Sequence, residues 1–143
     1  MKIAIGCDHA AFKEKSILID YIKIELGFSI VDLGAYSSDS VDYPEYGHLV
    51  GNTIATKEAD KGIVLCGSGI GISIAANKIK GIRAALCTSE KHAIMSRKHN
   101  DANILAFGAR FTDIESIKLI TKVWLNTAFE GGRHLMRINK IEL

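Results

Sequence analysis

The sequence predicts an α/β fold, a Rossmann-like three-layer sandwich with a five-stranded parallel sheet and a C-terminal helical arm. Three observations predict it. Short runs rich in Val, Ile and Ala recur without alternating polar residues, as in strands that are buried on both faces of a parallel sheet. Segments with an apolar spacing of about 3.6 residues separate these runs. The 143 residues have the length of one domain, expected to span residues 1–143.

The N-terminal half contains two predicted pairs of strand and helix. The first strand is expected over residues 2–6 and the first helix over residues 12–26. The second strand covers residues 29–33, and the second helix covers residues 46–57. Pro44, the single proline, precedes this helix at a position where proline can open it.

The C-terminal half supplies three more strands, predicted over residues 62–66, 83–87 and 104–107. Helical spacing is found over residues 90–99 and 114–126. The segment 131–137 follows the last helix and has no strand pattern, so we expect an arm or a short helix there.

Composition excludes several classes of protein. Hydrophobic residues make up 48% and charged residues 24% of the chain, which is typical of a globular domain. The net charge of +2 is too small to indicate a nucleic-acid partner, and no apolar segment is long enough to cross a membrane. Three cysteines without paired spacing favour a reducing compartment. The apolar run after Lys2 is too short for a signal peptide, so we expect a cytoplasmic protein.

The most informative segment is Cys66-Gly67-Ser68-Gly69-Ile70-Gly71, which directly follows an apolar run. Glycines let backbone amides approach a small anionic group closely, so the loop suits chemistry on a carbonyl or a phosphate. The alternative is a tight strand-to-helix turn without a ligand. A dinucleotide-binding loop is disfavoured, because the third glycine of that fingerprint is missing and the next predicted strand ends at Leu86-Cys87-Thr88 without an acidic residue for a ribose. A phosphotyrosine-phosphatase loop is excluded because Ile72 stands where that chemistry needs arginine.

Several polar residues are expected to share the edge of the sheet where this loop lies. Asp8, Cys66, Ser68 and Cys87 all follow predicted strands, and ligands of open parallel sheets bind beyond the carboxyl ends of the strands. A thiol at a helix N-terminus has its thiolate favoured and can act as a base or a nucleophile. For Cys66 the alternative is a buried, inert thiol.

The two other thiols, Cys7 and Cys87, lack a glycine context and are expected in the core or at its rim. A metal site formed by Cys7, His9, Cys66 and Cys87 would need paired ligand spacings, and none occurs. We therefore expect no metal.

Basic residues near the C-terminus indicate an anionic ligand. His99 closes a polar helix, and it is either solvated or points into the cleft as an acid, because imidazole titrates near neutral pH. Arg133 and Arg137, four residues apart, form either a solvated face or a phosphate clamp, which His9 and Arg110 could join. The residues alone thus indicate a site for an anionic small molecule.

Seven motifs follow one another along the chain: Gly6-Cys7-Asp8-His9, Asp42-Tyr43-Pro44, Cys66-Gly67-Ser68-Gly69-Ile70-Gly71 continuing to Lys78, Gly81-Ile82-Arg83-Ala84, His99-Asn100-Asp101-Ala102-Asn103, Phe107-Gly108-Ala109-Arg110 and Glu130-Gly131-Gly132-Arg133-His134. Together they resemble the ribose-5-phosphate isomerase B type of sugar-phosphate isomerases. The resemblance covers essentially the whole chain. It implies an interconversion of ribose 5-phosphate and ribulose 5-phosphate through an enediolate, in the non-oxidative pentose phosphate pathway, without metal or cofactor.

The resemblance also implies catalytic roles. Cys66 aligns with the family's base, and the glutamate that some relatives use six residues later is replaced here by Ile72. His99 is implied as the group that opens the sugar ring. Removing a proton from a sugar carbon requires a stabilised oxyanion. The expected donors for it are the Ser68 hydroxyl and the amides of Gly67, Ser68, Gly69, Ile70 and Gly71.

Further residues are implied in substrate binding. Asp8 and Asp42 would contact sugar hydroxyls, and Asn100 would help to hold the sugar. The implied phosphate ligands are His9, Arg110, Arg133 and Arg137, some of them supplied by a second subunit. We therefore expect at least a homodimer with shared active sites, with a tetramer as the alternative.

Other functions remain open from the sequence. A subunit of galactose-6-phosphate isomerase shares much of this fold and loop, and allose 6-phosphate is a further candidate substrate. A non-catalytic sensor of phosphosugars is the alternative from a different class.

Overall fold

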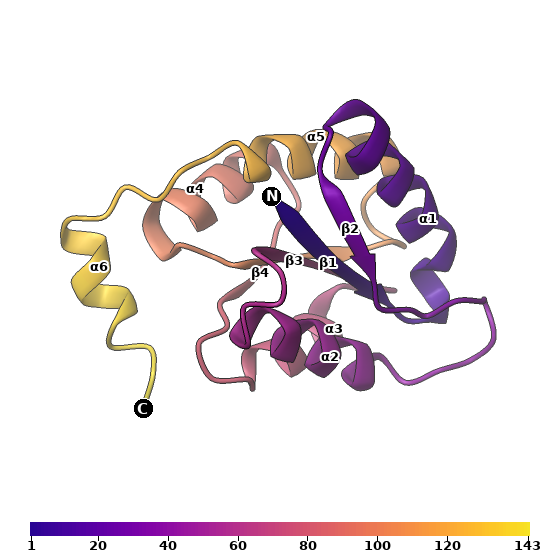
Figure 1. Cartoon of the computed structure of the whole chain (residues 1–143), viewed down its shortest axis with the longest axis horizontal. Coiled ribbons are helices and arrows are strands. Elements are labelled where there is room, and N and C mark those ends of the chain that lie inside the picture. Colours follow the sequence, from indigo (N-terminus) through magenta and orange to yellow (C-terminus); the bar gives the residue numbers. More distant parts are fainter.

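The computed structural model describes residues 1–143, and it contains one parallel sheet between two layers of helices (Figure 1). The strands are β1 (Lys2–Cys7), β2 (Ser29–Asp32), β3 (Lys61–Cys66), β4 (Ala84–Leu86) and β5 (Ile104–Gly108). The helices are α1 (Phe12–Asp20), α2 (Tyr43–Ala55), α3 (Ile70–Asn77), α4 (Glu90–Asn100), α5 (Ile114–Leu125) and α6 (Arg133–Ile138). The predicted α/β class is confirmed.

The sheet has the order β2-β1-β3-β5-β4, and every neighbouring pair is parallel. Its register places Cys7 beside Leu65, and Cys66 beside Gly108. The carboxyl ends of the three central strands therefore meet at one edge. A site at this edge can draw residues from the loops after β1, β3 and β5.

Two hydrophobic clusters, one on each face of the sheet, hold the layers together. On one face, α1, α4 and α5 contribute Leu18, Ala93 and Trp124. On the other face, α2 and α3 contribute Val50 and Ile72. Burying one large aliphatic or aromatic side chain stabilises a fold by about 1.5–3 kcal/mol, so both faces contribute substantially, as a doubly covered sheet requires.

The predicted strands agree with the observed ones to within about two residues at each end. The predicted helix over residues 12–26 is less regular, because α1 follows a 3-10 turn at His9–Ala11 and passes into a π-helical turn at Tyr21–Glu25. Pro44 lies in the first turn of α2, as predicted. The short helix expected near the C-terminus is α6.

Close packing of α2 against α3 depends on glycine. A Cβ atom on Gly47 would lie 2.8 Å from the carbonyl oxygen of Ile72 and 2.9 Å from the Cβ of Ala75. Real Cβ atoms do not approach backbone this closely, so only glycine lets the helices meet. This contact positions α3, whose first two residues, Ile70 and Gly71, end the glycine loop.

Lys15 is fully buried. Its position in a helix on the surface of the sheet does not predict this burial. Its ammonium pairs with the carboxylate of Asp32 and donates a hydrogen bond of 2.8 Å to the carbonyl of Ala35. The same carboxylate accepts a hydrogen bond of 3.0 Å from the amide of Gly34. The network therefore anchors the loop after β2, which leads to Asp42.

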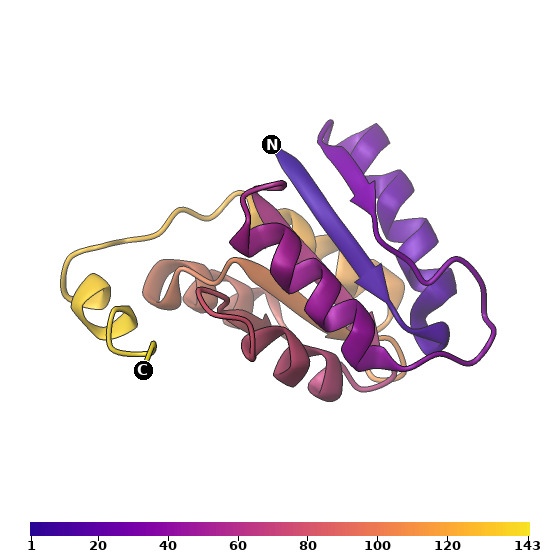
Figure 2. The same cartoon turned by 60° about the horizontal axis from the view of Figure 1, so that its bottom comes forward.

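The C-terminal arm stands apart from the sandwich. After α5, an extended segment leads away from the sheet to α6 (Figure 2). Of the other helices, α6 packs against α4, and it leaves Leu135 and Met136 largely exposed. The arm thus presents apolar surface that its own chain does not cover. No helix of the chain combines the length and apolar character needed to cross a bilayer.

Candidate active site

A cleft of about 580 Å³ opens at the carboxyl ends of the central strands. It is lined by Asp8, Tyr43, Cys66, Gly67, Ser68, Ile70, Gly71, Ile74, Arg110 and Phe111. Seven of these ten residues belong to the candidate site predicted from the sequence. The sequence did not assign Tyr43, Ile74 and Phe111 to the site, although Tyr43 and Ile74 belong to two of the motifs. The cleft therefore forms where the strand topology predicts a ligand site.

The glycine loop has a conformation that side chains would prevent. Gly69 has φ of +77°, and a Cβ atom there would lie 2.6 Å from the carbonyl carbon of Phe107. A Cβ atom on Gly71 would lie 2.6 Å from the ring of Tyr43. Left-handed backbone and close approach to backbone atoms thus require glycine at position 69, whereas a side chain at position 71 would have to displace the ring of Tyr43.

The amides of this loop divide into two groups. The N–H of Gly69 donates to Sγ of Cys66 over 3.1 Å, and the N–H of Ile70 donates to Oγ of Ser68 over 3.2 Å. The amides of Gly67, Ser68 and Gly71 donate no hydrogen bond within the chain. Three of the five predicted donors are therefore available to a ligand, whereas the other two organise the loop.

Cys66 lines the cleft, although it is only 4% exposed and also belongs to the hydrophobic cluster on the α2 and α3 face of the sheet. Cys7 and Cys87 are buried in the hydrophobic core. Burial raises the pKa of the Cys7 thiol to about 11 and also raises the pKa of Cys87. The Cys87 thiol lies 3.8 Å from the hydroxyl of Ser96, a residue of α4. The expected convergence of Cys87 with Cys66 is therefore wrong, whereas its placement in the core is confirmed.

Asp8 and His9 follow β1 at one wall of the cleft. The carboxylate of Asp8 is mostly buried and accepts a hydrogen bond of 3.0 Å from the amide of Ala10. Nδ1 of His9 lies 3.1 Å from both the backbone nitrogen and the carbonyl oxygen of Val41. This contact ties the loop that carries the exposed Asp42 to the end of β1. His9 and Asp42 thus stand beside the cleft, next to residues that line it.

Arg110 brings a positive charge to the glycine loop. Its amide donates a hydrogen bond of 3.0 Å to the carbonyl of Gly67. Its guanidinium packs over the same residue, because a Cβ atom on Gly67 would lie 3.1 Å from Nη1 of Arg110. An exposed guanidinium beside free amides forms an environment for an anion.

Seven predicted site residues do not line this cleft. His9, Asp42 and Gly69 are sequence neighbours of residues that line it, whereas His99, Asn100, Arg133 and Arg137 belong to α4 and α6. His99 lies in the last turn of α4, which leads to the amino end of β5. The backbone there is hydrogen bonded to the amino end of β3, through Asn103 and Gly62. The length of β3 separates this end from Cys66, on the order of 15 Å or more. His99 therefore does not reach the cleft of its own chain, because a helix between parallel strands returns to the opposite edge of the sheet, and its role in ring opening stays a prediction.

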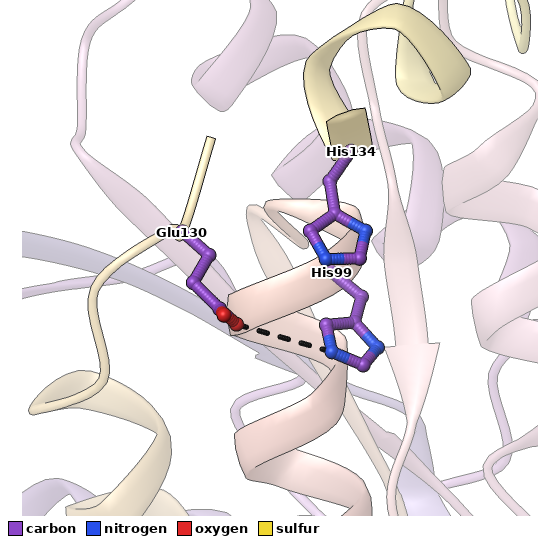
Figure 3. Close-up of side chains that lie close together, drawn as sticks. All are labelled: His99, Glu130 and His134. Carbon is purple, nitrogen blue, oxygen red and sulfur yellow. Dashed lines mark ion pairs between the residues drawn. The ribbon is translucent and has the colours of Figure 1, made fainter. Parts of the chain in front are cut away.

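His99 instead belongs to a cluster with Glu130 and His134 (Figure 3). The two imidazole rings are stacked with centroids 4.3 Å apart and an angle of 16° between their planes. Nε2 of His99 lies 3.9 Å from Oε2 of Glu130. Burial, with the nearby His99 and Arg133, lowers the pKa of His134 below the usual histidine value. Two imidazoles and a carboxylate thus meet where α4 and the arm come together.

Buried Arg97 holds the two segments of this cluster in place. Its guanidinium donates hydrogen bonds to the carbonyls of Thr127 (3.1 Å) and Ala102 (2.7 Å), and pairs with the Asp101 carboxylate (2.7 Å). Thr127 begins the extended segment that leads to Glu130. The position of His99 relative to the arm is therefore set by a buried cation that the sequence analysis did not identify.

One group of side chains has ligand atoms close enough together to hold a metal ion. It consists of His99, Glu130 and His134, whose ligand atoms all lie within 4.8 Å of one another. The four residues considered from the sequence, Cys7, His9, Cys66 and Cys87, do not form such a group. This group lies outside the cleft of its own chain.

Comparison with known proteins gives a consistent result. The model of a family described as ribose/galactose isomerase matches residues 3–141. Ribose-5-phosphate isomerase B of Escherichia coli is 46% identical over 140 residues, which cover 98% of this chain and 93% of the relative. A putative sugar phosphate isomerase of Bacillus subtilis is 46% identical, over 99% of this chain and 95% of the relative.

Solved structures agree in fold over the same length. Ribose-5-phosphate isomerase B of Clostridium thermocellum has a TM-score of 0.97 at 48% identity, covering 99% of this chain and 95% of the other. The enzyme of Thermotoga maritima has a TM-score of 0.96 at 48% identity, covering 99% and 97% of the two chains. The similarity thus includes the cleft and the C-terminal arm.

Proposed function

The chain belongs to the ribose/galactose isomerase family and is an isomerase, and from this premise we propose that it interconverts ribose 5-phosphate and ribulose 5-phosphate through an enediolate. One observation carries the proposal. Cys66 lies in the cleft beside the unpaired amides of Gly67, Ser68 and Gly71. A base and oxyanion donors are therefore adjacent, as proton transfer next to a carbonyl requires.

Cys66 is the proposed base. As a thiolate, it takes the proton from C2 of the open-chain aldose and returns it to C1. The hydrogen bond from the amide of Gly69 stabilises negative charge on the sulfur, and Ile72 leaves no carboxylate at the position that some relatives use. The electrons of the broken C–H bond form the C1–C2 double bond, and the charge collects on O1.

The unpaired amides are the proposed oxyanion donors. A single donor of this kind is worth about 3–4 kcal/mol in the transition state, so the three amides of Gly67, Ser68 and Gly71 offer a large part of the stabilisation required. As the reaction proceeds, the proton on O2 leaves and O1 gains one. The hydroxyl of Ser68 lines the cleft and is the proposed carrier between the two oxygens.

The remaining residues are proposed to hold the substrate. Asp8, at the wall of the cleft, and Asp42, beside it, accept hydrogen bonds from sugar hydroxyls. Arg110 and His9 bind the phosphate, because a guanidinium and an imidazole at the cleft provide charge and N–H donors for it.

We propose that a homodimer completes each site. His99, Asn100, Arg133 and Arg137 cannot reach the cleft of their own chain, but the arm of a second copy could bring them to it. Apolar surface supports this arrangement, because Leu135 and Met136 of α6 are exposed, and so are Ile70, Ile74 and Phe111 around the cleft. In the completed site, His99 opens the sugar ring and Asn100 helps to hold the sugar.

An isomerase assay tests the proposed function. Purified protein is incubated with ribose 5-phosphate, galactose 6-phosphate and allose 6-phosphate in parallel, and formation of each ketose is measured. We expect turnover of the pentose phosphate. A preference for a hexose phosphate would assign another substrate, and binding without turnover would identify a phosphosugar sensor.

Cys66→Ala tests the base assignment. We expect the substitution to abolish turnover while the affinity for ribose 5-phosphate, measured by calorimetry, is largely retained. Cys87→Ala, which removes a thiol from the core, is the matched control and should remain active. Full activity of Cys66→Ala would show that another group is the base.

A further inference from the structure

We propose that His99, Glu130 and His134 form a binding site for a transition-metal ion of the zinc type, and that the bound ion inhibits the isomerase. The proposal starts from the donor set. Two imidazoles and one carboxylate occur within 4.8 Å of one another, and three such ligands are sufficient to hold a zinc ion with a fourth position open to water. Figure 3 shows the three side chains converging from α4, the extended segment and α6.

The ring nitrogens are free to bind. Neither His99 nor His134 forms a side-chain hydrogen bond within the chain, and the nearest polar partner of His99 is Glu130 at 3.9 Å. Histidines with structural roles usually have a hydrogen-bond partner when they are buried. His134 as a residue is buried, but its ring nitrogens are not buried atoms and have no partner in the chain, so they remain open to a ligand.

Only modest side-chain movement is needed to form the site. Ligand atoms of a tetrahedral zinc ion, at about 2.0–2.1 Å from the metal, lie roughly 3.4 Å apart. His134 is held by its burial, whereas the side chains of His99 and Glu130 are 41% and 55% exposed. The stacked rings point their nitrogens in similar directions, so the His99 ring must turn about its Cβ–Cγ bond for both nitrogens to face one ion.

The surrounding charges select the class of metal. Arg133 precedes His134 in α6, and Arg137 lies one turn further along. These cations oppose every divalent ion, so a bound metal must gain its affinity from its bonds to nitrogen. This condition disfavours Mg²⁺ and Ca²⁺, which are bound mainly by charge and prefer oxygen ligands. Zn²⁺, Ni²⁺ and Cu²⁺ form strong bonds to imidazole nitrogen, so the cluster suits these ions.

The inhibitory part of the proposal rests on the proposed function. When a metal ion occupies the lone pair of His99, this imidazole can no longer exchange a proton with the ring oxygen of the sugar. The ion would also fix the arm against α4. We therefore expect zinc to slow turnover of the ring-closed substrate and a chelator to restore it.

Metal binding is measured first, independently of activity. Co²⁺ is added to metal-free full-length protein, its visible absorption is recorded, and Zn²⁺ is used to displace it. Glu130→Gln and His134→Gln should each weaken binding at least about tenfold, since even outer-shell partners of metal ligands are worth 10–100-fold. His92→Gln, which removes an exposed histidine from the same helix, is the matched control and should bind like the unmodified protein.

Three outcomes of this binding experiment overturn the site. In the first, Glu130→Gln and His134→Gln bind the metal as tightly as the unmodified protein. In the second, Cys66→Ala loses metal binding. In the third, neither cobalt nor zinc binds at millimolar concentration. Circular dichroism confirms that each variant is folded. Because the Glu130 side chain is 55% exposed, its substitution removes no core residue.

Inhibition is then measured with zinc in the isomerase assay. Glu130→Gln should retain the basal activity and require at least about tenfold more zinc for half inhibition, whereas His92→Gln should be as sensitive as the unmodified protein. Metal binding without any isomerase activity would reject the proposed function and leave the site standing. Equal zinc sensitivity of Glu130→Gln and the unmodified enzyme would reject inhibition through this site.

Discussion

The backbone N–H of Gly69 donates a hydrogen bond to Sγ of Cys66, with 3.1 Å between the two atoms. This contact depends on the left-handed backbone of Gly69, whose φ is +77°. The same turn leaves the amides of Gly67, Ser68 and Gly71 without partners in the chain. One glycine thus orients the proposed base and exposes the proposed oxyanion donors.

Gly69→Ala should therefore damage both stability and activity. A left-handed conformation costs an alanine about 1–2 kcal/mol, and its Cβ would also lie 2.6 Å from the backbone of Phe107. We expect the free energy of unfolding to fall by about 2–3 kcal/mol and turnover to be lost, as measured by urea unfolding and the isomerase assay. Gly27→Ala is the control, because Gly27 has φ of +74° but no atom within 4 Å of its Cβ position. Equal effects of the two substitutions would contradict the role given to the close contact.

The three thiols should react with iodoacetamide in a definite order. All three cysteines are buried, but Cys66 lines the cleft, whereas Cys7 and Cys87 lie in the core away from it, where burial raises the pKa of both thiols. At pH 8 we expect Cys66 to be modified first, and ribose 5-phosphate to slow its modification. Peptide mapping by mass spectrometry follows each site. In urea the three cysteines should become similarly reactive, and early modification of Cys7 or Cys87 in the folded protein would contradict this order.

The local pattern of the sequence predicts the strands and the cleft well, because both depend on neighbouring residues. A buried strand is a short apolar run, and the glycine loop directly follows one of them. Contacts between residues that are distant in the sequence are harder to predict from it. The burial of Lys15 depends on Asp32 and Ala35, which lie beyond the end of its helix, and β5 lies between β3 and β4 although it follows both in sequence.

The position of His99 was predictable from topology rather than from its sequence motif. A helix that follows β4 and precedes the parallel β5 must end at the amino edge of the sheet. Cys66 ends β3 at the carboxyl edge. Composition and spacing cannot show this separation, but the order of strand, helix and strand excludes His99 from its own cleft. Motifs that belong to one proposed site can therefore lie on two copies of the chain.

Stability should decrease in mild acid because of His134. Burial and the neighbouring His99 and Arg133 lower the pKa of His134 in the folded protein, so the unfolded chain binds a proton more readily near the usual histidine pKa of about 6.5. The stabilisation is thus present above this pH and is lost as the pH falls through the folded-state value. Urea unfolding at pH 7.5 and 5.5 should show a smaller loss for His134→Gln than for the unmodified protein. His92→Gln is the control, and equal losses in all three proteins would exclude this contribution.

Mixing two inactive variants should restore activity if the site is shared between two copies. Cys66→Ala lacks the proposed base, and His99→Asn lacks the proposed ring-opening group. In a hybrid dimer, one cleft combines the intact Cys66 of one copy with the intact His99 of the other. Random pairing makes half of the dimers hybrids with one intact cleft each, so refolding an equal mixture should recover about a quarter of the unmodified activity. A mixture of Cys66→Ala with the double variant should recover none. If both residues served the cleft of their own chain, every cleft in the first mixture would lack either Cys66 or His99, and no activity would return.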